Sequence, residues 1–138
     1  MSRSDTLLDS INQFYEDPKN SQYLTDILDK KSTVSLRNLE WFITNYSKKR
    51  SLSYKTSDGK TFTVHCAYKS SLDGYSKKLF DPFCRTDKFE YVLPNSATTT
   101  TTTVTTTVAQ LNFIRWCIKN NVIDYIVKNK SDLFIKSS

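Results

Sequence analysis

The sequence predicts an α+β fold in which a small antiparallel sheet packs against helices, with a helical arm at the N-terminus. Apolar residues recur at helical spacing in several segments, and two other segments suit strands joined by an Asp-Gly turn. The chain has 138 residues, 38% of them apolar, which is the size of one ordinary domain. The sequence contains no run of about 20 apolar residues, so we predict no membrane span.

Residues 1–30 form the predicted acidic helical arm. They carry three basic and six acidic side chains, whereas residues 31–138 carry 17 basic and 8 acidic ones, so the net charges are −3 and +9. Two helical stripes, separated by Asp17-Pro18, either pack on the main core or form an interaction element. The stripes are Leu7, Leu8, Ile11, Phe14 and Tyr15, then Tyr23, Leu24, Ile27 and Leu28.

Two stronger helices are predicted in the basic α+β domain at residues 31–138. The first covers 35–47, is capped by Ser35 and ends in three cations, which a helix dipole favours at its C-terminus. The second covers 107–119, where Thr107 and Gln110 match a capping box, and a short helical segment follows Asn120-Asn121. Their apolar faces are Leu36, Leu39, Trp41, Phe42, Ile43 and Tyr46, then Val108, Leu111, Phe113, Ile114, Trp116, Cys117 and Ile118.

Three strands are predicted between these helices. Residues 51–56 and 61–68 flank a turn at 57–60, and residues 88–93 alternate apolar with polar side chains. Segment 69–85 separates the second and third strands, begins with a short helix capped by Ser70 or Ser71, and breaks at Asp81-Pro82. The threonine-rich tract at 98–107 is expected to be a loop.

Four stretches resemble a small basic uncharacterised protein family of giant DNA viruses of the mimivirus type. They are SLRNLEWFITNYSKK at 35–49, YKSSL at 68–72, FDPFCR at 80–85 and TTVAQLNFIRW at 106–116. The resemblance covers roughly residues 35–126 and leaves the N-terminal arm outside. It implies a viral context, in the host cytoplasm at the viral factory or in the virion, and it supplies no catalytic residues. It also implies that the threonine tract expands a shorter loop.

Few residues suit catalysis or metal binding. The single histidine, His65, adjoins Cys66 on a predicted strand, so their side chains point to opposite faces and cannot share one metal ion. The three cysteines, Cys66, Cys84 and Cys117, are interpreted as small buried residues in a reducing compartment. Neither glycine belongs to a phosphate-binding loop motif. We therefore predict no catalytic residue, no metal and no cofactor, although carboxylates at Glu40, Asp73, Asp81 and Asp87 leave a divergent nuclease open.

Nucleic-acid binding is the predicted function, because lysine and arginine contact phosphates and aromatic rings stack on unpaired bases. Segment 69–85 interleaves cations with Tyr75, Phe80 and Phe83; Tyr75 is the predicted stacking platform, and the two phenylalanines are assigned to the core. Arg115 and Lys119 extend this patch or face solvent. The predicted phosphate contacts are Lys48, Lys49, Arg50, Lys69, Lys77, Lys78 and Arg85.

The predicted partner is therefore DNA or RNA, with no membrane, held by a non-enzymatic accessory protein. The alternative is a structural or virion-packaged protein whose acidic arm pairs with the basic body of another copy, and the sequence leaves homo-oligomer formation open.

Overall fold

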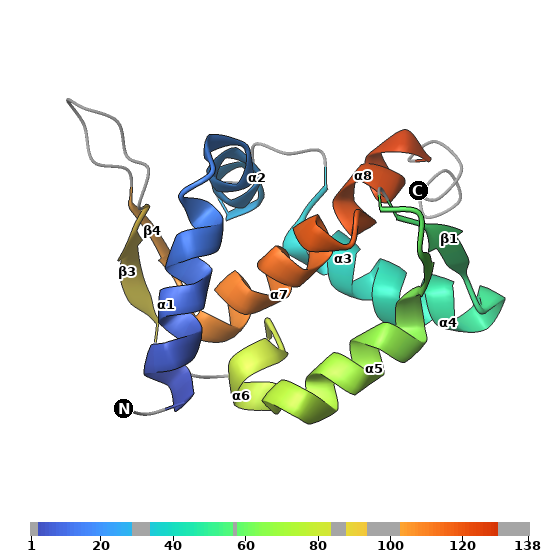
Figure 1. Ribbon diagram of the computed structural model, residues 1–138, viewed down its shortest axis with the longest axis horizontal. Coiled ribbons are helices and arrows are strands. Elements are labelled where there is room, and N and C mark those ends of the chain that lie inside the picture. Colours follow the sequence, from blue (N-terminus) through green and yellow to red (C-terminus); the bar gives the residue numbers. More distant parts are fainter. Residues whose placement is uncertain (1–2, 29–33, 57, 84–87, 94–102, 130–138) are drawn as a thin grey trace.

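The structure, a computed structural model, describes residues 3–28, 34–56, 58–83, 88–93 and 103–129 (Figure 1). Helices dominate it, and two short antiparallel ribbons lie at opposite sides of the molecule. The elements are α1 (Arg3–Tyr15), α2 (Pro18–Leu28), α3 (Leu36–Trp41), the π-helix η1 (Phe42–Tyr46), α4 (Ser47–Arg50), β1 (Ser53–Lys55), β2 (Thr61–Thr63), α5 (Val64–Tyr75), α6 (Lys77–Phe80), β3 (Phe89–Val92), β4 (Thr103–Thr106), α7 (Val108–Lys119) and α8 (Val122–Lys128).

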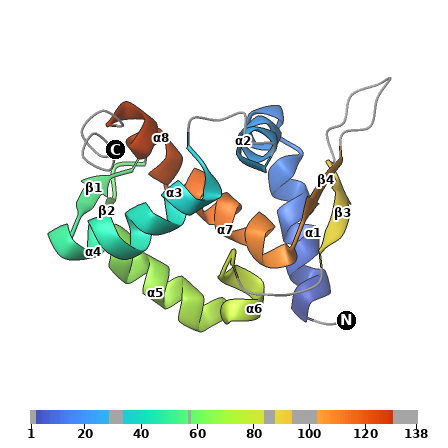
Figure 2. The same cartoon turned by 180° about the vertical axis from the view of Figure 1, so that it is seen from behind.

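Helix α7 is the centre of the core. Every residue from Leu111 to Cys117 is buried, and α1, α2, α6 and α8 all pack against this helix (Figures 1 and 2). A helix that is buried all round belongs in the middle of a fold, because it leaves no face for solvent. None of the helices within the described ranges is long and apolar enough to cross a membrane.

The apolar stripes of α1 and α2 lie in this same core. Ile11, Tyr15 and Leu24 are fully buried with Leu111 and Ile114 of α7. The Tyr15 hydroxyl donates a hydrogen bond to the Leu111 carbonyl oxygen at 2.9 Å. The N-terminal helices therefore pack on the rest of the chain, while the proposed domain division at residue 30 stays a prediction.

The α+β class is confirmed, but the strands form two separate ribbons where one small sheet was predicted. Strands β1 and β2 pair antiparallel, with Tyr54 opposite Phe62. Strands β3 and β4 form the other ribbon, with Tyr91 opposite Val104. The predicted third strand at 88–93 is thus confirmed, and its partner is a segment predicted to be a loop.

The second predicted strand, 61–68, was wrong after Thr63. Helix α5 begins at Val64, so Ser70 and Ser71 lie inside it and cap nothing. Val64 and Tyr68 are four residues apart, a spacing that shares one face in a strand and in a helix alike, so the pattern could not distinguish them. Both side chains are buried. The predicted break is confirmed, because α6 ends at Phe80 and Asp81 has extended backbone angles.

Part of the threonine tract forms a strand, which corrects the prediction of a loop there. Residues Thr103 to Thr106 are β4, in which Val104 and Thr106 are buried and their neighbours are exposed. Threonine and valine are β-branched and suit a strand, and β3 offers the partner that the sequence pattern did not reveal. The remainder of the tract, 98–102, lies outside the described residues.

The helix caps predicted at Ser35 and Thr107 are confirmed. The Ser35 hydroxyl accepts a hydrogen bond from the Asn38 amide at 3.1 Å, and the Thr107 hydroxyl accepts one from the Gln110 amide at 3.1 Å. The Gln110 side chain does not complete a capping box with Thr107. Its carboxamide oxygen accepts from the Thr106 hydroxyl and its amide donates to the Pro82 carbonyl, which ties α7 to β4 and to the end of α6.

Candidate nucleic-acid interface

The first predicted cation group lies at the end of a helix that runs without interruption from Leu36 to Arg50. Ser35 and Asn38 cap its start reciprocally, because the Asn38 side chain accepts from the Ser35 amide at 3.0 Å. Within η1 the hydrogen bonds span five residues, as in the bond from the Ser47 amide to the Phe42 carbonyl. The Thr44 hydroxyl donates to the Glu40 carbonyl at 2.8 Å and so competes for a backbone acceptor just before this turn.

Helix α4 exposes Lys48, Lys49 and Arg50 together. The helix ends at Arg50. Ser51, which follows it, has a left-handed φ of 46°, and the Leu52 amide donates to the Ser47 carbonyl at 3.0 Å. The three cations therefore occupy the last helical turn, where the free carbonyl groups make positive charge favourable.

Helix α5 brings Lys69 toward these cations. It packs against η1 and α4, as Figure 2 shows, and His65 lies in its first turn. Burial lowers the pKa of His65 below its ordinary value of 6.5, and the charges of Lys48 and Lys69 lower that pKa further. Lys48 and Lys69 thus act on one imidazole from two elements. We call Lys48, Lys49, Arg50 and Lys69 the α4–α5 cluster.

No carboxylate within the described ranges forms an ion pair with any member of the α4–α5 cluster. All four side chains are exposed. Exposed like charges that approach one another repel, and mobile counterions screen that repulsion in water. The cluster is consequently a surface on which a polyanion could replace those counterions.

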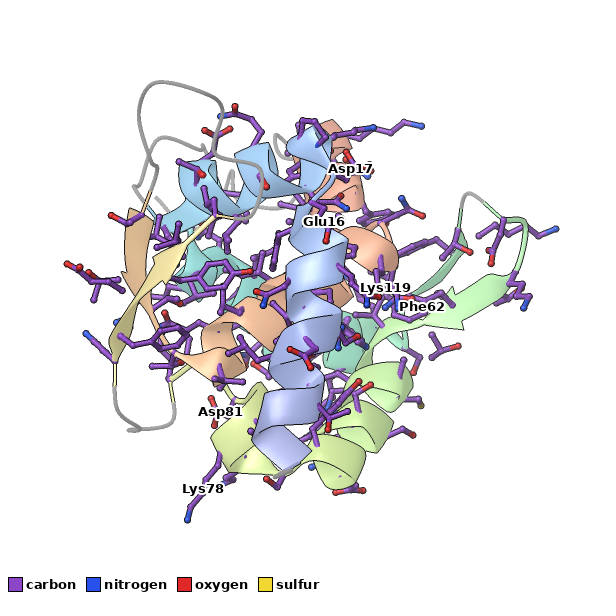
Figure 3. All side chains as sticks on the ribbon, turned by 60° about the vertical axis from the view of Figure 1, so that its left-hand side comes forward. Glu16, Asp17, Phe62, Lys78, Asp81 and Lys119 are labelled. Carbon is purple, nitrogen blue, oxygen red and sulfur yellow. The ribbon has the colours of Figure 1, made fainter. Side chains whose placement is uncertain are left out.

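Lys77 and Lys78 form a separate group. They lie on α6, which follows Ser76, a residue with a positive φ of 76°. Helix α6 is at the end of α5 that is far from α4 (Figure 1). Both are exposed, and Lys78 points away from the body of the molecule (Figure 3). The structure therefore does not bring this pair into the α4–α5 cluster, and its role in binding stays a prediction. Arg85 lies outside the described residues.

Tyr75, the predicted stacking platform, is partly buried. Its ring stacks on Phe80 with centroids 5.7 Å apart, and its hydroxyl accepts from Arg115 Nη2 at 3.5 Å. Arg115 itself is only 7% exposed and donates to Ser10 Oγ and Asn112 Oδ1, both at 2.8 Å. Arg115 is thus part of the interior and does not extend the patch. Lys119, on the same helix, is exposed near Phe62 (Figure 3).

Three exposed residues were missed in the sequence. Trp41 was assigned to an apolar helix face, yet it is 36% exposed. Phe83 was assigned to the core with Phe80; Phe80 is buried, but Phe83 is 46% exposed. The guanidinium carbon of Arg37 lies 5.8 Å from the centroid of the Phe83 ring. Arg37 lies four residues, about one helical turn, before Trp41. This spacing is the one signal in the sequence that could have predicted a surface group of Arg37 with an exposed ring.

His65 and Cys66 lie on a helix and not on the predicted strand. Cys66 is exposed, against the interpretation of a small buried residue, while Cys117 is buried and its burial raises the pKa of its thiol. Cys84 lies outside the described residues. In the part of the chain that the structure describes, no three His, Cys, Asp or Glu side chains gather as metal ligands would.

The fold and this surface define a small helical α+β protein that presents a group of exposed cations at one helix end. The model of a family of unknown function, DUF7197, matches residues 2–137, and the chain belongs to this family. The match includes the N-terminal arm, which the resemblance had left outside.

A protein of Acanthamoeba polyphaga mimivirus, itself uncharacterised, is 38% identical over 124 residues. These residues are 87% of this chain and 48% of the relative, so the chain spans about half the length of that protein. Together the two matches confirm an uncharacterised giant-virus family. No solved structure matches the chain.

Proposed function

We propose that this viral protein binds nucleic acid by contacting phosphates with the α4–α5 cluster. In this proposal it is a non-enzymatic accessory protein that acts at the viral factory in the host cytoplasm or inside the virion. Phosphate contacts carry no sequence information, so the binding would be tolerant of sequence and sensitive to salt.

One observation supports the proposal above the others: α5 packs against α4, so Lys48 and Lys69, 21 positions apart in the chain, are exposed on neighbouring helices. Folding brings these like charges together without a carboxylate to pair with them among the described residues. A bound phosphate would offset the repulsion and replace the counterions of both lysines.

Replacing Lys48 and Lys69 by glutamine should weaken binding to a single-stranded oligonucleotide by about tenfold at moderate salt. The slope of log K against log salt should fall by about 1.4, since each lost phosphate contact removes about 0.7. Fluorescence anisotropy at several salt concentrations measures both quantities.

The matched control is the double replacement of Lys19 and Lys88 by glutamine. These two lysines are also exposed, but they lie on α2 and beside β3, away from α4. Both variants lose two charges, so an equal loss of affinity would mean that only net charge matters and that no dedicated surface exists.

The single histidine reports where the phosphates bind. A phosphate between Lys48 and Lys69 favours the protonated imidazole, so the oligonucleotide should raise the pKa of His65 in an NMR titration. An unchanged pKa at saturating oligonucleotide would place the phosphates elsewhere.

The alternative, pairing between the acidic arm of one copy and the basic body of another, has no specific observation in its favour. The apolar stripes of α1 and α2 are already used within the chain. Exposed carboxylates such as Glu16 and Asp17, at the end of α1 in Figure 3, are what remains for such pairing.

A further inference from the structure

A line of cations and rings runs along the helix that carries the α4–α5 cluster. Arg37, Trp41, Tyr46 and Arg50 follow one another at intervals of four, five and four residues, with Phe83 beside Arg37. We call these five residues the α3–α4 stripe. Its last member, Arg50, belongs also to the α4–α5 cluster, so the two groups form one continuous surface.

The π-helix creates this alignment. In a regular α-helix each residue advances about 100°, so Tyr46 would lie about 140° around the axis from Trp41. In η1 the backbone hydrogen bonds span five residues, so each turn holds more residues than in an α-helix and residues five apart come closer to the same side of the axis. The rings of Trp41 and Tyr46 consequently come to 5.9 Å between centroids.

Each end of the stripe holds a guanidinium group against a ring. The Arg50 guanidinium lies over the Tyr46 ring at 4.0 Å, and that of Arg37 lies 5.8 Å from the Phe83 centroid. Trp41, between them, has 36% of its surface exposed, and Phe83 has 46%. Flat rings that alternate with cations match a single-stranded ligand, whose bases present flat faces and whose backbone presents phosphates.

We infer that the α3–α4 stripe binds unpaired bases, so that the ligand of this surface is single-stranded nucleic acid. This inference rests on the proposed function. Bases would stack on Trp41 and Phe83, while Arg37 and the α4–α5 cluster hold the neighbouring phosphates. A duplex offers the same phosphates but keeps the faces of its bases covered by the adjacent base pairs, so it could not use the rings.

Three probes of equal length separate the rings from the charges. They are an oligothymidylate, an abasic oligomer with the same phosphates, and a duplex. The protein should bind the oligothymidylate about tenfold more tightly than the abasic strand, since stacking on one ring contributes about that much. The same preference should hold over the duplex at equal salt.

Trp41→Leu should remove this preference and leave the dependence of binding on salt unchanged, because all the cations remain. Trp41→Phe keeps a ring and should retain most of the preference. Phe89→Leu, a loss of an aromatic ring on β3 away from the stripe, serves as the matched control and should change nothing. Thermal unfolding of each variant shows that it is folded at the temperature of the assay.

Tryptophan fluorescence gives a second measurement. The chain has two tryptophans, and Trp116 is buried with 9% exposure, so quenching by a stacked base reports on Trp41. Oligothymidylate should quench the wild-type protein, the abasic strand should not, and Trp41→Phe should abolish the quenching.

The outcomes distinguish this inference from the proposed function. The single-strand inference alone would be overturned by three results together: all three probes bind with equal affinity, Trp41→Leu has no effect, and the Lys48 and Lys69 variant still loses affinity. Absence of binding to every probe at low salt would overturn both. If Trp41→Leu does not fold, the fluorescence result and Trp41→Phe still decide.

Discussion

Replacing Tyr15 by alanine is expected to lower the free energy of unfolding by about 3–5 kcal/mol. Tyr15 lies in the acidic N-terminal arm, but its side chain is fully buried. Its ring meets Phe14 and Tyr91 edge to face at 5.0 and 6.3 Å, and its hydroxyl bonds to the Leu111 carbonyl of α7. Alanine would leave a cavity between the arm and the central helix, and such cavities relax only in part. Urea unfolding measures the change.

Two further substitutions make the result interpretable. Tyr15→Phe keeps the ring and removes one buried hydrogen bond, so it should cost about 1 kcal/mol. Glu16→Ala, at the exposed neighbouring position, should stay within about 0.5 kcal/mol of the wild type. If Tyr15→Ala cost less than about 1 kcal/mol, the arm would not be an integral part of the core.

Alkaline pH is expected to unfold the protein between pH 10 and about 12. Burial raises the pKa of Tyr68 and of Tyr91 to about 12 from the ordinary value of 10, and burial also raises the pKa of Tyr15. A hydrogen bond to Asp124 Oδ1 at 2.6 Å raises the pKa of Tyr23 to about 12. Because the unfolded chain loses these protons first, their contribution is complete below pH 10 and is lost as the pH rises toward 12.

Tyr68→Phe tests this explanation with one residue. The variant keeps the buried ring but has no proton to lose. The slope of its unfolding free energy against pH should therefore be shallower than that of the wild type, by up to about 1.4 kcal/mol per pH unit. Circular dichroism follows unfolding while tyrosinate absorbance follows ionisation. Ionisation of all eight tyrosines near pH 10 in the folded protein would contradict the expected result.

Local signals predicted much of the helical framework. Asp17-Pro18 separates α1 from α2 and Asp81-Pro82 follows α6, because the residue before proline avoids the helical region. Ser35 and Thr107 begin helices because their hydroxyls satisfy backbone amides that have no helical partner. These features depend on a few neighbouring residues, so the chain alone reveals them.

The errors occurred where partners distant in the sequence decide the conformation. The pattern from 64 to 68 fits both a strand and a helix, and burial of Val64 and Tyr68 in the core selects the helix. Thr103–Thr106 becomes a strand because β3 supplies backbone partners. Phe83, assigned to the core, is exposed because Phe80 alone of the two fits the interior beside Tyr68 and Phe113.

The sequence by itself determined the helix starts at Ser35 and Thr107, the breaks at Asp17-Pro18 and Asp81-Pro82, the basic segment that closes the helix at 50 and the α+β class, since each follows from short-range chemistry. Only the tertiary structure decided which cations approach one another and which rings stay outside. Lys69 comes near Lys48 because α5 packs against α4 and η1. Tyr46 comes beside Trp41 because the hydrogen bonds of η1 span five residues, which widens the helical turn. Both depend on packing between distant segments or on a shift of backbone hydrogen bonds, which no spacing in the sequence records.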